Sequence, residues 1–212
     1  KDVEQDAILR SIVRLPGMEP SGSTITPFRE ETMTELFHRP GFLGTAANFA
    51  ADTTLVLLLL VAALFTIGAY LAKKAQAIER GRSPDGLRPE RARVLFRHHR
   101  RVQTTGVILS TVLVLWMMLL PYRDFVAPGL PALWAQPFYL VTTVHAVIGF
   151  FAFLIGNFVV LRGHRLVPQR LRFADYKPWM RAAYGLYMAT MLLGVGVYVV
   201  WFVTNPNPPV YR

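Results

Sequence analysis

Four long apolar stretches divide the chain, and polar or charged residues bound each of them. They run from about residue 49 to 72, 102 to 120, 138 to 162 and 178 to 203. A helix rises about 1.5 Å per residue, so each stretch is long enough to cross the roughly 30 Å hydrocarbon layer of a bilayer. The pattern predicts an all-α membrane protein whose four transmembrane helices form a bundle.

A polar N-terminal extension, residues 1–48, precedes this transmembrane domain (49–203), and a proline-rich tail (204–212) follows it. Apolar positions at helical spacing predict two short amphipathic helices in the extension, one ending at Pro16 and one beginning after Thr26. The chain starts with lysine rather than methionine, so we expect a processed chain or one that starts inside a longer protein.

Basic residues gather in two of the three loops. Of the 23 lysines and arginines, ten lie between the first and second spans and six around the third-to-fourth connection, whereas loop 121–137 holds only Arg123. The positive-inside rule places both basic loops in the cytoplasm. We therefore predict a multi-pass protein of the bacterial cytoplasmic (inner) membrane with its N-terminus and C-terminus outside. The extension agrees with this, since its acidic residues outnumber its basic ones.

The composition narrows the function classes. The net charge of +10 suggests nucleic-acid binding, but membrane topology already accounts for the basic residues, so we expect no nucleic-acid partner. The chain has no cysteine, which excludes disulfides, iron–sulfur clusters and thiolate metal sites. No paired intramembrane carboxylates, nucleophile with a base, or glycine-rich phosphate loop is visible, so the sequence predicts a protein that is not an enzyme and has no metal site.

The third apolar stretch contains a histidine, His145, about two turns from its outer end. At about 100° per residue, Gly149, Ala152 and Gly156 share its helix face. An imidazole above a groove of small residues suits a closely packed helix or a flat ligand. We therefore take His145, Gly149 and Gly156 as candidate cofactor-binding residues. An interhelical hydrogen bond would satisfy the imidazole equally well.

A b-type haem would need a second axial ligand at the depth of His145. His145 lies roughly 10 Å below the outer surface, and the histidines flanking the spans lie at the cytoplasmic end, roughly 20 Å further in. Paired histidine ligation is thereby excluded. Met117 and Met118 are the outer-half alternatives, although methionines in membrane helices are more often packing residues. The cofactor stays unknown, and no paired ligand set supports haem b or quinone.

A second cluster of histidines and arginines lies at the cytoplasmic membrane face. So many neighbouring arginines disfavour a divalent cation and favour lipid phosphates or the acidic surface of a partner. The predicted lipid or partner contacts are Arg97, His98, His99, Arg100, Arg101, His164 and Arg165.

Several short motifs follow in an order that resembles a known family, the four-transmembrane domain of unknown function 420, which includes the cytochrome oxidase maturation factor CtaM. The motifs are Asn48 before the first span, His99-Arg100 opening the second, Thr143-Val144-His145 in the third, and Arg181, Leu186-Tyr187 and Gly194-Val195-Gly196-Val197-Tyr198 in the fourth. The resemblance covers roughly residues 42 to 203. Tyr176 stands where the family carries a histidine.

The resemblance implies a non-catalytic accessory subunit or assembly factor of a haem–copper oxidase or a related electron-transfer complex. Its expected partners are membrane lipids and subunits of a respiratory or photosynthetic electron-transfer complex. The alternative is a membrane protein that binds b-type haem or quinone through His145.

Overall fold

The computed structural model describes residues 38–81, 89–171 and 176–209, which all belong to one compact unit, Glu35–Arg212. These residues are predominantly helical, and four helical segments are long and apolar enough to cross a membrane. The prediction of an all-α protein with four membrane-length helices is confirmed. The amphipathic helices predicted within residues 1–37 lie outside the described residues.

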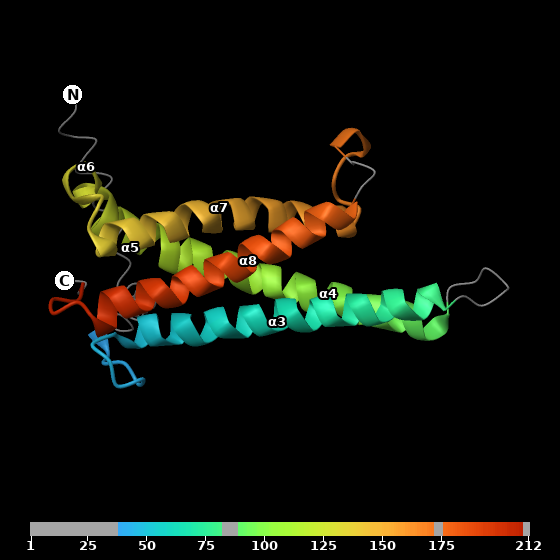
Figure 1. Ribbon diagram of the computed structural model, residues 1–212, viewed down its shortest axis with the longest axis horizontal. Coiled ribbons are helices and arrows are strands. Elements are labelled where there is room, and N and C mark those ends of the chain that lie inside the picture. Colours follow the sequence, from blue (N-terminus) through green and yellow to red (C-terminus); the bar gives the residue numbers. More distant parts are fainter. Residues whose placement is uncertain (1–37, 82–88, 172–175, 210–212) are drawn as a thin grey trace, which may run out of the picture. The chain divides into compact units, whose positions relative to one another are not determined.

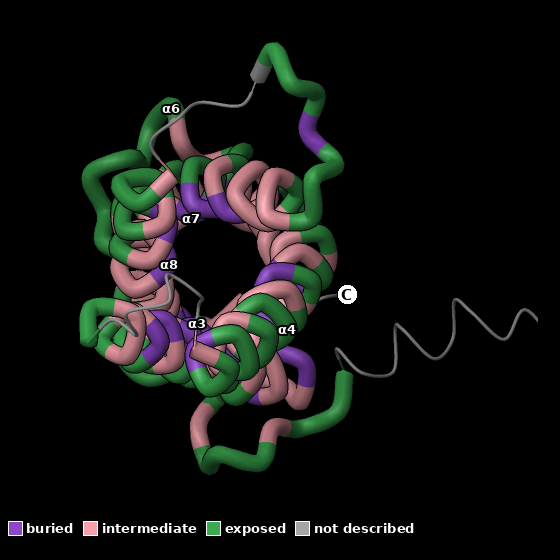
Figure 2. The backbone as a smooth tube through the Cα atoms, turned by 90° about the vertical axis from the view of Figure 1, so that its right-hand side faces the viewer, coloured by how far each residue is buried: buried purple, intermediate pink, exposed green. Residues whose placement is uncertain are grey.

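The four long segments form a ring of neighbouring helices. They are α3 (Phe49–Arg80), α4 (Glu90–Leu113) with its continuation to Leu133, α7 (Pro137–Gly163), and α8 (Tyr176–Tyr198), which η5 (Val199–Val203) extends. α3 packs along α4 and α7 along α8, and contacts of α3 with α8 and of α4 with α7 close the ring (Figure 1). Buried residues line the inward faces (Figure 2). The central core consists of Val61, Phe65, Val107, Leu113, Ala152 and Tyr187.

The second helical segment does not stop at Pro121, which corrects the sequence prediction. It continues through η1 (Val114–Met118), α5 (Leu119–Pro121), η2 (Tyr122–Val126), η3 (Ala127–Gly129) and α6 (Leu130–Leu133). Proline normally ends a helix because its ring meets the carbonyl four residues back. Here two π-helical turns, η1 and η2, flank Pro121 and widen the helix, which makes room for the ring. Most of the predicted 121–137 loop is therefore helical.

The helices α3 and α4 extend beyond their apolar stretches. The sequence indicated an end at Lys73-Lys74, but α3 continues to Arg80; its 32 residues measure about 48 Å at 1.5 Å per residue. In Figure 1 the α3–α4 hairpin projects past the ends of α7 and α8. Ala75 and Ala92 are fully buried, so the hairpin stays closely packed in this projecting part. The basic residues described in this hairpin thus lie on helices: Lys73, Lys74 and Arg80 on α3, and Arg91, Arg93, Arg97, Arg100 and Arg101 on α4.

The outward faces of the bundle carry large apolar side chains. Val56 and Leu60 of α3, Phe150 and Phe151 of α7, and Leu192 of α8 are all exposed. An exposed apolar surface of this kind on membrane-length helices suits contact with lipid chains.

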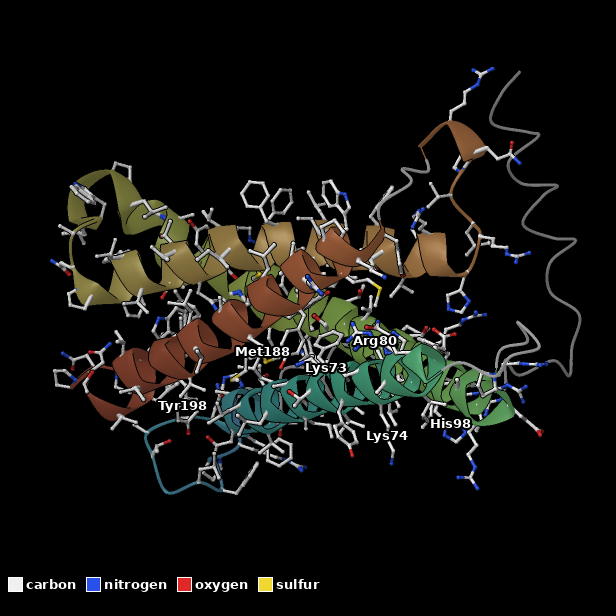
Figure 3. The ribbon with its side chains drawn as sticks, turned by 45° about the vertical axis from the view of Figure 1, so that its right-hand side comes forward. Lys73, Lys74, Arg80, His98, Met188 and Tyr198 are labelled. Atoms are coloured by element: carbon white, nitrogen blue, oxygen red, sulfur yellow. The ribbon has the colours of Figure 1, made fainter. Side chains whose placement is uncertain are left out.

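A buried carboxylate fixes the outer end of the bundle. Asp52, in the first turn of α3, has no exposed surface. Its Oδ2 accepts hydrogen bonds from the backbone N–H groups of Phe42 (2.6 Å) and Leu43 (2.7 Å), and its Oδ1 accepts one from the Tyr198 hydroxyl (2.5 Å). The Thr45 hydroxyl lies 2.7 Å from that of Tyr198. Asp52 therefore ties the preceding loop and the end of α8 to α3 (Figure 3 labels Tyr198).

We expect Asp52→Asn to destabilise the bundle by about 1–3 kcal/mol, because the amide oxygen can still accept from the two backbone N–H groups but as a neutral acceptor, and the NH₂ group cannot accept the hydrogen bond that Tyr198 now donates. Thermal unfolding in detergent measures the effect. Asp124→Asn is the matched control: Asp124 pairs with the largely exposed Arg123, and its loss should change stability by no more than about 0.5 kcal/mol. Equal unfolding temperatures for the two variants would contradict this account of Asp52.

Candidate functional site

His145 is bound to the neighbouring helix through one ring nitrogen. Its Nδ1 lies 3.0 Å from the backbone oxygen of Thr190 in α8. A carbonyl oxygen can only accept, so Nδ1 carries the proton and donates it. In the neutral imidazole, Nε2 then bears a lone pair and is the nitrogen that can bind a ligand. The interhelical hydrogen bond considered for His145 is present, and it leaves one nitrogen for ligand binding.

Gly194 makes this arrangement possible. A Cβ atom at this position would lie 3.1 Å from Cε1 of His145 and 2.7 Å from Cδ2 of Leu58. Gly194 also lies one turn beyond Thr190, so its lack of a side chain opens the approach to the Thr190 carbonyl. The glycine that the sequence suggested for tight packing serves to accommodate the imidazole.

A partly open cavity of about 180 Å³, lined by residues of all four helical segments, borders His145. Its lining includes the thioether side chains of Met117 and Met118 from η1 and of Met191 from α8. Hydrocarbon side chains and backbone supply most of the remaining wall, and no charged residue lines it among the described residues. The cavity is thus an uncharged space that combines one imidazole with three thioethers.

The π-helical turn η1 shapes the methionine side of the cavity. In η1 the N–H of Leu119 bonds to the oxygen of Val114, five residues back. A π turn holds one more residue than an α turn, so it changes the direction of the side chains that follow. Both adjacent methionines border the cavity. Met118 Sδ lies 3.7 Å from the position that a Cβ would occupy on Gly149.

The small-residue face predicted on the third span is buried within the bundle. Gly149, Ala152 and Gly156 all point inward. Gly149 borders the cavity next to His145, whereas the Tyr187 ring lies directly against Gly156. Gly156 therefore makes room for the Tyr187 ring of the neighbouring helix and does not line the cavity. Of the three predicted cofactor-binding residues, His145 and Gly149 meet at one site.

Aromatic residues surround the outer end of the cavity. The Trp201 indole donates to the Thr142 hydroxyl (2.8 Å), which in turn donates to the backbone oxygen of Phe138 (2.6 Å). The rings of Phe138 and Trp201 are stacked with centroids 4.7 Å apart. Trp201 and Thr142 both line the cavity and both are buried. This cluster forms the wall of the cavity at the end of the bundle where α7 begins.

The predicted lipid or partner contacts divide into two groups. His99 points into the α3–α4 hairpin, where Nδ1 lies 2.8 Å from the Gly68 oxygen, and His164 Nε2 lies 2.9 Å from the Thr104 hydroxyl. These two histidines therefore hold helices together. Arg97, His98, Arg100, Arg101 and Arg165 are exposed, and His164 is exposed as well despite its contact with Thr104. His98 projects outward from the hairpin (Figure 3).

Tyr176 also has a structural role at this end. Its hydroxyl donates to the Val159 oxygen (3.1 Å), and the Arg162 guanidinium lies 4.7 Å from its ring centroid. Tyr176 thus connects α8 to α7.

Two important site residues were not identified from the sequence. Thr190 acts through its backbone oxygen, for which side-chain identity gives no signal. Met191 could have been noticed, because it lies in the outer half of the fourth span at a depth similar to that of His145.

Comparison with family models, curated proteins and solved structures found no match for this chain.

We expect Gly194→Ala to lower the unfolding temperature, because the new methyl group would press on Leu58 and on the His145 ring. Gly185→Ala is the control on the same helix: nothing lies within 4 Å of its Cβ position, so alanine should be neutral or should stabilise by about 0.5–1 kcal/mol. Thermal unfolding of both variants in detergent tests this. A Gly194→Ala protein as stable as Gly185→Ala would refute the tight contact.

Proposed function

We propose that this protein is a non-catalytic accessory subunit or assembly factor of a haem–copper oxidase or a related electron-transfer complex. One observation carries the proposal: the residues on which the family resemblance rests include the contacts that hold the four helices together. Asn48 caps α3, His99 and His145 bind backbone oxygens of neighbouring helices, Tyr187 packs on Gly156, and Tyr198 binds Asp52. A chain built on the same four-helix architecture would need these contact residues, which supports the proposal.

The proposed setting is the bacterial cytoplasmic membrane, with the α3–α4 and α7–α8 connections in the cytoplasm. The charge distribution supports this orientation, because these connections carry most of the basic residues. Both lie at the same end of the bundle, opposite the end where Asp52 holds the loop before α3 (Figure 1). The projecting α3–α4 hairpin then offers its arginines to acidic lipid headgroups.

In this role the protein acts through binding. Its lipid-facing helices would pack beside a partner subunit, and its cavity would hold a small molecule or ion during assembly. A quinone headgroup is the second candidate occupant, favoured by the cavity volume: an engineered cavity of about 150 Å³ holds benzene, and this one measures about 180 Å³. A porphyrin, with four pyrrole rings, would require the helices to separate.

The test is purification of the affinity-tagged protein from its native membrane in mild detergent, followed by mass spectrometry of the copurifying chains. We expect subunits of a terminal oxidase or another electron-transfer complex, at levels well above those with an unrelated tagged four-helix protein. In a deletion strain we expect less assembled oxidase, restored by the wild-type gene. Normal oxidase assembly in the deletion strain, with no copurifying electron-transfer subunit, would overturn the proposal.

A further inference from the structure

The donor atoms around the cavity form a chemically unusual set. Three methionines, Met117, Met118 and Met191, line one cavity together with His145, and no carboxylate or thiolate is among the described lining residues. Elsewhere in the described residues, histidine, aspartate and glutamate side chains do not gather in threes to form a metal site. A metal in the described bundle would thus depend on thioethers, which are soft ligands that select Cu(I) over harder ions.

The residues that carry the candidate ligand atoms lie close together in the bundle. His145 and Gly149 are four residues apart on α7, so their Cβ positions lie about 5–6 Å from each other. Met118 Sδ lies 3.7 Å from the Gly149 Cβ position, and Gly149 lies one helical turn beyond His145 along α7. Met191 directly follows Thr190, whose oxygen holds the His145 ring. Methionine has three flexible side-chain torsions, which allow sulfurs from η1 and α8 to turn toward one ion.

The hydrogen bond from Nδ1 to Thr190 prepares the imidazole for metal binding. Metal-binding histidines generally donate their other ring N–H to a carbonyl or carboxylate, which fixes the tautomer and raises the basicity of the ligating nitrogen. His145 makes this contact at 3.0 Å and keeps Nε2 as the ligating atom. A structural histidine that held two helices together with both nitrogens would lack this property.

The uncharged lining of the cavity favours an ion of low charge. The solvation cost of moving an ion into an apolar interior rises with the square of its charge, so an uncharged cavity favours a monovalent over a divalent cation. Neutral thioethers and imidazole leave one net positive charge on a bound Cu(I). We infer that the cavity binds one cuprous ion through His145 Nε2 and the thioether sulfurs of Met117, Met118 and Met191.

This inference deepens the proposed function, since it names the ion that the site would hold, but its test is independent. The detergent-purified protein is titrated anaerobically with Cu(I) against a chromogenic Cu(I) chelator. We expect one Cu(I) per chain. X-ray absorption of the copper-loaded protein should show sulfur and nitrogen ligands in one coordination shell.

The variant for this test is Met118→Leu/Met191→Leu, because leucine conserves volume and removes the sulfur with little loss of stability. The matched control is Met188→Leu, on the same helix as Met191 but outside the cavity lining, where its sulfur lies 4.0 Å from the Thr66 hydroxyl. We expect the double variant to bind Cu(I) at least 10-fold more weakly while the control binds like wild type. His145→Gln should weaken binding similarly.

Several results would overturn the inference. They are no stoichiometric Cu(I) binding by the wild type, equal affinity in the double variant and the control, or a copper shell without sulfur. A quinone that copurifies and cannot be displaced by Cu(I) would also overturn it by assigning the cavity to the other candidate. Copurification of oxidase subunits is measured independently of Cu(I) binding. Failure of the copper site is therefore distinguishable from failure of the proposed function.

Discussion

The bundle depends on polar side chains that bind backbone oxygens of a neighbouring helix. In lipid a polar group has no water to bind, so it must find its partner within the protein. Contacts of this kind in the described part of the chain include His99 with Gly68, Gln103 with Phe65, His145 with Thr190, and Tyr176 with Val159. The first two join α4 to α3, and the others join α7 and α8. Each antiparallel helix pair is therefore held by specific hydrogen bonds as well as by packing.

Contacts between the two pairs explain where the cavity lies. At the end of the bundle where α3 begins, Tyr198 of α8 binds Asp52 of α3. Further toward the other end, Thr111 of α4 contacts Asn157 of α7 (3.5 Å), and the Phe65 and Tyr187 rings meet with centroids 4.3 Å apart. Between these levels small residues and flexible methionines face one another. The cavity occupies this interval, and His145 lies within it because its own bond runs to α8.

The sequence predicted the four spans because each has a continuous apolar run, and hydropathy depends only on local composition. It did not predict the course of the chain beyond Pro121, because two π-helical turns let a proline lie within a helix, and their formation depends on packing against α7 and η5. The local sequence gives no signal for the role of Asp52. Its partner Tyr198 is 146 residues away, and such a pairing exists only after folding.

At the candidate site, too, local sequence features could be predicted and contacts between distant segments could not. The face shared by His145, Gly149 and Gly156 follows from helical periodicity, so it could be predicted. Which members stay accessible depends on the facing helix, which supplies Tyr187 against Gly156 and leaves Gly149 beside the cavity. The methionines were interpreted as packing residues on general grounds. Their position around one cavity depends on η1 and on the register of α8, neither of which the sequence pattern encodes.

The cavity has an energetic implication of its own. Space between helices that side chains do not fill forfeits packing contacts, and the cost grows with the unfilled volume. Larger side chains at Gly149 or Ala146 would fill the space with ordinary packing, yet small residues line it there. A bundle that keeps this space open is stabilised when an occupant fills it, so stability and binding are linked at His145.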